Sequence, residues 1–193
     1  IGVPPLRRPS GLNHGLMPAA VTGAPLALLD RFDHSALLRL FATGAYDYWA
    51  GTPMMADVLS RCAVAGEPIA PRLSVIGGRL PPEVVRRFHD RFGVPLRQIY
   101  GTTETGSIAV DGGPVEAVRS ETAGRLLPGV EVRIGDDPRA PLREGAVGRI
   151  WVSAPDFLMD GYGVPPGLDP PDTVHGWWGT PDVRVLEGAG RLV

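Results

Sequence analysis

Short apolar runs alternate with segments of helical periodicity through the first half of the chain. The apolar runs predict strands at residues 26–29, 46–49, 73–76 and 96–100. The helical segments begin at Asp33, Pro53 and Pro81–Pro82, and Gly93 ends the last of them. Strands that alternate with helices in this way are typical of an α/β fold, in which crossover helices flank a layered, mostly parallel sheet.

The second half differs, because its short β-branched runs are separated by Gly, Pro or Asp and no helical pattern is evident. These runs lie at residues 108–110, 130–134, 147–152 and 183–186. They predict a small antiparallel β-sheet or open barrel. We therefore expect an α/β subdomain over residues 1–106 and a β-barrel-like subdomain over residues 107–193. The Pro-rich segment 163–175 is expected to be an irregular, mobile loop.

Composition and charge narrow the classes to which the chain can belong. Its 193 residues carry a formal net charge of −2 with 44% apolar residues, which suits one globular domain or two small ones. All nineteen basic residues are arginines, scattered among twenty-one acids without a basic stripe, which argues against a nucleic-acid partner. The longest apolar stretch, residues 15–29, is interrupted by Pro, Gly and Thr, so no membrane span is predicted.

The cysteine and histidine content predicts neither a disulfide nor a zinc site. Cys62 is the only cysteine, which excludes an intramolecular disulfide and leads us to expect a reducing, cytoplasmic location. The four histidines, His14 among them, have no Cys or carboxylate partners at metal-ligand spacing. We expect most of them to be solvated.

The segment most informative about chemistry is residues 98–106, where a predicted strand leads into a loop rich in Gly and Thr. Ligands dock at the carboxyl ends of strands in open α/β sheets. Glycine lets the backbone approach a phosphate, threonine hydroxyls can donate to its oxygens, and Tyr100 offers a flat face for a base. Glu104 would repel a phosphate unless a cation lies between them, so the loop favours Mg²⁺ bound with a nucleotide. On composition alone, a plain turn between two strands is the alternative.

The residues Tyr100-Gly101-Thr102-Thr103-Glu104 resemble the Tyr-Gly-x-Thr-Glu core motif of the adenylate-forming superfamily. That superfamily comprises acyl- and aryl-CoA ligases, peptide-synthetase adenylation domains and luciferases. Five more blocks resemble its motifs in the right order, at residues 74–83, 123–132, 148–152, 159–162 and 176–182. Six ordered blocks make the resemblance far more specific than one five-residue match.

The resemblance implies a role for each matching residue. Tyr100 would stack on adenine, Asp182 would accept the ribose hydroxyls, and Thr103 would contact the α-phosphate. Glu104 would hold Mg²⁺, and with Thr103 it would form the catalytic pair. The nucleotide-binding residues that the resemblance implies are Gly77, Gly78, Arg79, Tyr100, Gly101, Thr102, Thr103 and Asp182.

The first part of the chain indicates which class of carboxylic acid is the substrate. Adenylation domains for amino acids carry an Asp that pairs with the substrate ammonium, and the matching position here is Ser10. Residues 1–29 hold no carboxylate, so a fatty or aromatic acid is favoured over an amino acid. Arg8 stands where many CoA ligases have a His or aromatic residue, which leaves the usual gating role in doubt. Candidates for the acyl-pocket wall, by position only, are Trp49, Gly51, Met54, Gly78 and Gly101. A Trp or Met on an apolar element more often belongs to the core, which is the alternative for two of them.

The resemblance to this superfamily implies an ATP-dependent ligase that joins a small carboxylic acid to a thiol through an acyl adenylate. The expected cofactors and partners are ATP or AMP, Mg²⁺, and coenzyme A or the pantetheine of a carrier protein. The family's Lys-bearing phosphate loop and Lys-bearing lid have no counterpart in this lysine-free sequence. We therefore expect a piece of a longer enzyme, with adenylation by these residues alone severely impaired or absent.

Two other readings stay open on the sequence. One is a non-catalytic nucleotide- or adenylate-binding module, or one half of a split enzyme, because the nucleotide motifs are present without the lysine segments. The other is an ordinary dinucleotide-binding domain, which is disfavoured because no Gly-x-Gly-x-x-Gly opens a helix.

Overall fold

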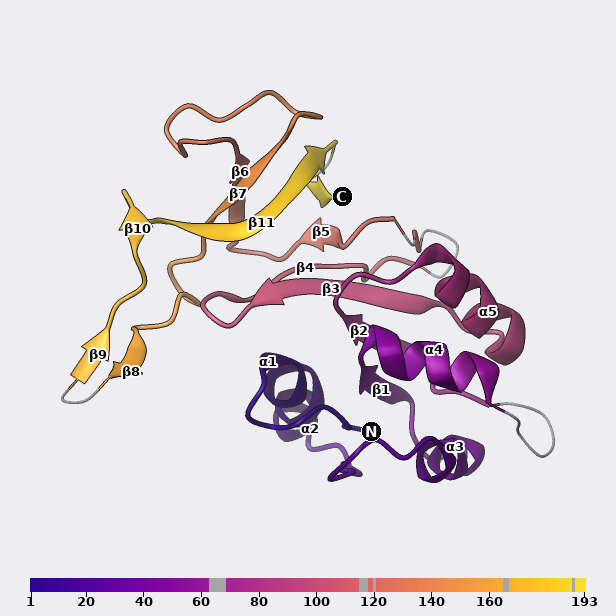
Figure 1. Ribbon diagram of the computed structural model, residues 1–193. Coiled ribbons are helices and arrows are strands. Elements are labelled where there is room, and N and C mark those ends of the chain that lie inside the picture. Colours follow the sequence, from indigo (N-terminus) through magenta and orange to yellow (C-terminus); the bar gives the residue numbers. More distant parts are fainter. Residues whose placement is uncertain (63–68, 115–117, 120, 165–166, 189) are drawn as a thin grey trace. The chain divides into compact units, whose positions relative to one another are not determined.

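The computed structural model describes residues 1–62, 69–114, 118–119, 121–164, 167–188 and 190–193 (Figure 1). The chain forms two compact units. The first consists of Ile1–Ile99 and Asp111–Glu121, and the second of Tyr100–Val110 and Thr122–Val193. The chain thus crosses between the units three times, because residues 111–121 return to the first unit. Arg97 holds this return segment by donating to the carbonyls of Asp111 and Gly113 at 2.8 and 2.5 Å.

The first unit is an α/β layer. Its helices are α1 (Pro9–Gly11), the π-helix η1 (Leu12–Leu16), α2 (Met17–Thr22), α3 (His34–Ala42), α4 (Pro53–Arg61) and α5 (Pro82–Phe92). Its strands are β1 (Tyr48–Gly51), β2 (Leu73–Gly77) and most of β3 (Leu96–Thr102). The strands β1, β2 and β3 pair in parallel, which confirms the predicted fold class for this half.

The helix boundaries follow the predicted punctuation. Asp33 caps α3, because its carboxylate accepts a hydrogen bond from Ala36 N at 3.0 Å. Pro53 occupies the first turn of α4, and Gly93 ends α5 in the left-handed conformation with φ of 68°. Apolar positions of α3, α4 and α5 pack with strand residues into one core, in which Leu37, Leu59 and Phe88 are fully buried.

Two predicted strands of the first unit differ from the structure. Residues 26–29 form no strand, and Leu28 makes only an isolated bridge to Gly2. This short apolar run takes its backbone hydrogen bonds from the first residues of the chain, because Gly2 N donates to Ala27 O at 3.0 Å. The strand predicted at 46–49 begins two residues later, at Tyr48. The exposed Asp47 side chain instead pairs with Arg72 at 2.8 Å.

The second unit is an antiparallel sheet, as expected. Its strands are β4 (Gly106–Val110), β5 (Gly124–Leu126), β6 (Glu131–Ile134), β7 (Val147–Ser153), β11 (Trp177–Glu187) and β12 (Arg191–Leu192), which lie in the order β4-β5-β12-β11-β7-β6. Ile108, Ile150 and Leu192 are fully buried in its own core. No α-helix occurs in the described part of residues 107–193, as the sequence predicts.

The segment predicted as an irregular loop contains short strands. Tyr162–Val164 (β8) and Gly167–Asp169 (β9) form an antiparallel hairpin, and Thr173–Val174 (β10) pairs with the start of β11. Each of these strands is only two or three residues long, and so short a pattern is hidden among the prolines of the segment.

None of the helices that the structure describes is long and apolar enough to cross a membrane.

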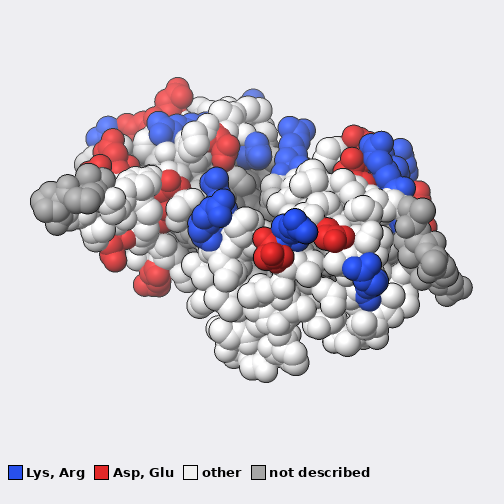
Figure 2. Space-filling model, turned by 60° about the horizontal axis from the view of Figure 1, so that its bottom comes forward, with Lys and Arg blue, Asp and Glu red and all other residues white. Residues whose placement is uncertain are grey.

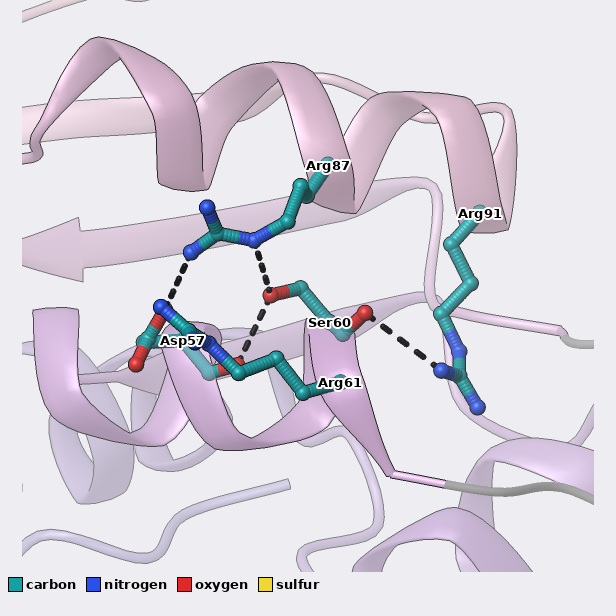
Figure 3. Close-up of polar contacts among 5 residues, drawn as sticks. All are labelled: Asp57, Ser60, Arg61, Arg87 and Arg91. Atoms are coloured by element: carbon teal, nitrogen blue, oxygen red, sulfur yellow. Dashed lines mark hydrogen bonds and ion pairs between the residues drawn. The ribbon is translucent and has the colours of Figure 1, made fainter.

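A polar cluster joins α4 to α5, which lie side by side in the first unit (Figures 1 and 3). The Asp57 carboxylate accepts a hydrogen bond from Arg61 Nε at 2.9 Å and forms an ion pair with Arg87. Arg87 Nε also donates to Ser60 Oγ at 3.4 Å, and Arg91 donates to the Ser60 carbonyl at the same distance. Desolvation raises the pKa of Asp57, but the two bound guanidinium groups outweigh it and hold that pKa below its usual range.

We expect Asp57→Asn to lower the free energy of unfolding at neutral pH by about 0.5–1 kcal/mol, as for other exposed ion pairs. A carboxyl whose folded-state pKa is depressed adds stability above its unfolded pKa of about 4, and that stability is lost as the pH falls through the folded-state value. Urea unfolding should therefore show a difference between wild type and variant at about pH 6 that shrinks below about pH 4. Asp90→Asn, on the exposed side of α5, is the control; a loss that persists unchanged at about pH 3 would contradict this account of the ion pair.

Candidate functional site

The loop between β3 and β4 is a tight turn in the second unit. Thr102 ends β3 and Gly106 begins β4. The hydroxyls of Thr102 and Thr105 lie 2.9 Å apart, and Thr105 N donates to Thr102 Oγ1 at 3.2 Å. A Cβ at position 101 would lie 2.1 Å from Gly106 O, so only glycine fits at Gly101. Thr103 is exposed at the tip of the turn.

Tyr100 and Asp182 meet beside this turn although 82 positions separate them. Tyr100 Oη donates to Asp182 Oδ2 at 2.8 Å, and Asp182 N donates to Thr180 Oγ1 at 3.1 Å. The Arg184 guanidinium lies 5.7 Å from the centre of the Tyr100 ring. Burial, and then the hydrogen bond to the Asp182 carboxylate, raise the pKa of Tyr100, so the phenol stays a neutral donor. An aromatic ring thus lies next to a carboxylate whose remaining lone pairs can accept further hydrogen bonds.

Glu104 is held by a residue for which the sequence suggested no role. Tyr162 Oη donates to Glu104 Oε1 at 2.6 Å, and the Glu104 carbonyl accepts from Met159 N at 2.7 Å. The hydrogen bond to Glu104 raises the pKa of Tyr162. The block at residues 159–162 was visible as a motif, but its contact with Glu104 spans 58 positions and could not be read from local spacing.

The residues around Glu104 fit a magnesium ion held jointly with a nucleotide. Within the described ranges, no group of three or more His, Cys, Asp or Glu side chains could hold a metal ion alone. Mg²⁺ at nucleotide sites is bound by one or two carboxylates together with substrate phosphates and water. Glu104 is half-buried and supplies one carboxylate, which matches that requirement.

In the first unit, the glycine turn after β2 faces the start of the chain. A Cβ at Gly77 would lie 3.7 Å from both His14 Nδ1 and Ser10 Cβ. Gly78 has φ of +115°, which requires glycine, and Arg79 is exposed. His34, His89 and His175 are exposed, as expected for most of the histidines, whereas His14 is half-buried and burial lowers the pKa of its imidazole.

The predicted pocket-wall residues of this unit fall into two environments. Trp49 is fully buried, with its ring stacked on Phe88 at 6.0 Å and edge-on to Phe41 at 5.5 Å. A Cβ at Gly51 would lie 2.3 Å from the Trp49 ring, so the indole covers this glycine. Met54, in contrast, is 56% exposed at the start of α4. Trp49 thus packs within the core of this unit.

The visible surface carries no concentrated charge. Basic and acidic side chains are interspersed on the face shown in Figure 2, without a continuous basic stripe. Residues 9–29, which include α1, η1 and α2, contain no Asp, Glu, Lys or Arg. The segment that contains Ser10 and His14 therefore offers polar groups but no ionised carboxylate.

Comparison with known proteins identifies relatives along the whole chain. A family model described as AMP-binding enzyme matches residues 3–163. The indoleacetate–CoA ligase of Aromatoleum aromaticum is 31% identical over 97% of this chain and 37% of its own length. The medium-chain fatty-acid–CoA ligase of Escherichia coli is 29% identical over 97% of this chain and 34% of its own length.

Solved structures agree with these matches. The amide bond synthetase McbA from Marinactinospora thermotolerans aligns with a TM-score of 0.73 at 32% identity, over 89% of this chain and 36% of that protein. The chain thus spans about a third of the length of the relatives that it matches.

Proposed function

The chain belongs to the AMP-binding enzyme family, and on that premise we propose that it is part of an ATP-dependent acid–thiol ligase. The whole enzyme would join a carboxylate to the α-phosphate of ATP, release pyrophosphate and transfer the acyl group to a thiol. The family match over residues 3–163 supports this proposal, since it includes the loop with Tyr100 and Glu104.

The observation that carries the proposal is the 2.8 Å hydrogen bond between Tyr100 and Asp182. A base and a ribose are neighbouring parts of one nucleoside, so residues that bind them must lie close together. An aromatic ring can stack on adenine, and a carboxylate can accept two vicinal hydroxyls. The hydrogen bond holds the phenol end of the ring beside the carboxylate before a nucleotide binds, which reduces the ordering cost of binding.

The protein's part in the reaction is to position groups and to stabilise charge, because little covalent work is needed in nucleotidyl transfer. The Thr103 hydroxyl would donate to the α-phosphate at the exposed tip of the turn. Glu104 would hold Mg²⁺, which when bound offsets the negative charge that develops on the phosphate oxygens.

The proposed substrate is a fatty or aromatic carboxylic acid. Residues 1–29 offer no carboxylate to pair with the ammonium of an amino acid, and Ser10 lies beside Gly77 where such a carboxylate would be expected. The curated relatives named above are ligases of indoleacetate and of medium-chain fatty acids. The proposed acceptor is coenzyme A or the pantetheine of a carrier protein, and the first is supported by the names of these two relatives.

Nucleotide binding tests the proposal directly. We expect AMP to bind this chain saturably in calorimetry and Tyr100→Ala to weaken it about 10-fold or more, since base stacking on an aromatic ring contributes about 1–3 kcal/mol. Tyr100→Phe keeps the ring and should retain most of the affinity. Asp182→Asn should weaken AMP more than the corresponding 2′,3′-dideoxynucleotide, because only AMP offers the ribose hydroxyls.

Asp90→Asn, on the exposed side of α5, is the matched control and should bind AMP like the wild type. Unchanged affinity in both Tyr100→Ala and Asp182→Asn would contradict the assigned residues. Nucleotide binding without acid-dependent release of pyrophosphate by the full-length protein would favour a non-catalytic adenylate-binding module.

A further inference from the structure

Glu104 is attached at two points to the segment 159–162. Its side chain accepts the 2.6 Å hydrogen bond from Tyr162 Oη, and its carbonyl accepts the 2.7 Å hydrogen bond from Met159 N. A surface carboxylate in a turn normally samples several rotamers, because nothing restricts its side chain. Because one hydrogen bond holds the main chain of Glu104 and the other holds its side chain, the turn and the carboxylate are restricted together.

The segment that makes these contacts is itself fixed by the β8–β9 hairpin. Tyr162 pairs with Asp169 across the hairpin. A Cβ at Gly161 would lie 2.7 Å from Asp169 O, so the backbone passes the opposite strand too closely for any other residue. The Tyr162 ring therefore projects from a constrained backbone, although its side chain is 44% exposed. Burial is not what positions it.

Resting on the proposed function, we propose that Tyr162 is a positioning residue that orients the Glu104 carboxylate for Mg²⁺ held jointly with the nucleotide phosphates. A carboxylate has about four acceptor positions on its two oxygens, so donation to Oε1 leaves Oε2 free to bind the metal. Hydrogen-bond donors to metal-binding carboxylates orient them in this way, and their removal typically costs about 10–100-fold in metal affinity.

The affinity for nucleotide with Mg²⁺ and the affinity without it should respond differently to the loss of the Tyr162 hydroxyl. Tyr162 contacts Glu104 and would touch neither base nor ribose, so its hydroxyl should affect only the gain in affinity that Mg²⁺ produces. A merely structural role would instead weaken metal-free and metal-bound nucleotide alike, because the whole turn would move.

The test measures the affinity of the chain for α,β-methylene ATP by calorimetry, once with Mg²⁺ and once with EDTA. The ratio of the two dissociation constants is the magnesium gain. We expect Tyr162→Phe to reduce this gain about 10-fold and to leave the EDTA value unchanged. Glu104→Gln should remove most of the gain, and adding Tyr162→Phe to it should have no further effect, because the two residues act through one carboxylate.

Tyr48→Phe is the matched control, since Tyr48 Oη donates a 2.6 Å hydrogen bond to the His14 carbonyl in the other unit. It should keep the full magnesium gain. A full or increased gain in Tyr162→Phe, or equal losses with Mg²⁺ and with EDTA, would overturn the inference while the proposed function stands. A wild-type chain that binds nucleotide without any magnesium gain would also overturn it. A wild-type chain that binds no nucleotide would overturn the inference together with the assignment of a nucleotide site to these residues.

Discussion

Replacing Trp49 with alanine is expected to lower the free energy of unfolding by about 3–5 kcal/mol. The indole is fully buried between Phe41 and Phe88, so its removal leaves a cavity that the neighbouring rings cannot fill. Gly51 adds to the effect, because its backbone lies directly against the Trp49 ring and would lose that contact. Urea unfolding followed by far-UV circular dichroism measures the loss.

Two further variants make this result specific to burial. Phe157→Ala removes an aromatic ring that is 54% exposed and should change stability by no more than about 0.5 kcal/mol. Trp49→Phe should lower the free energy of unfolding much less than Trp49→Ala does, because it keeps an aromatic ring in the core. It also removes an indole N–H that has no partner among the residues described. A loss in Trp49→Ala similar to that in Phe157→Ala would mean that Trp49 is not a core residue.

Gly101→Ala should both destabilise the second unit and reduce nucleotide binding. The new Cβ would lie 2.1 Å from Gly106 O, which is backbone and cannot rotate away. Strands β3 and β4 would have to separate at the turn, at a cost of about 1–3 kcal/mol. Tyr100 and Thr102 flank the changed residue, so we expect the affinity for AMP to fall by at least as much as in Tyr100→Ala.

Gly163→Ala is the matched control, because a Cβ at that position in β8 meets nothing within 4 Å. It should preserve AMP affinity and change stability only slightly. Wild-type affinity and stability in Gly101→Ala would show that the turn is looser than the structure describes.

The boundaries of α3, α4 and α5 were predicted well, and particular residues explain why. Asp33, Pro53 and Gly93 act on their own local backbone, through a side-chain cap, a fixed φ and a left-handed φ. Such signals need no distant partner. The run at 26–29 resembled a strand, but a strand needs a neighbour with free backbone groups, and among the residues described only Gly2 bonds to it.

The candidate site was predictable residue by residue but not as an arrangement. The motif around residues 100–104 indicated a nucleotide loop, and Asp182 was recognised from its own block. Their contact depends on β11 returning to the turn after β3, and no local pattern specifies that return. Tyr162 had no assigned role for the same reason, since its acceptor is 58 positions away.

Local chemistry was therefore enough to predict the α/β layer, the antiparallel sheet and the resemblance to adenylate-forming enzymes, because periodicity, helix punctuation and motifs are short-range properties. The tertiary structure decided which side chains meet. It packed Trp49 into the core, joined Tyr100 to Asp182 and gave Glu104 its partner. Each of these outcomes depends on chain segments that are distant in sequence and are brought together by the pairing of strands and the burial of apolar surface.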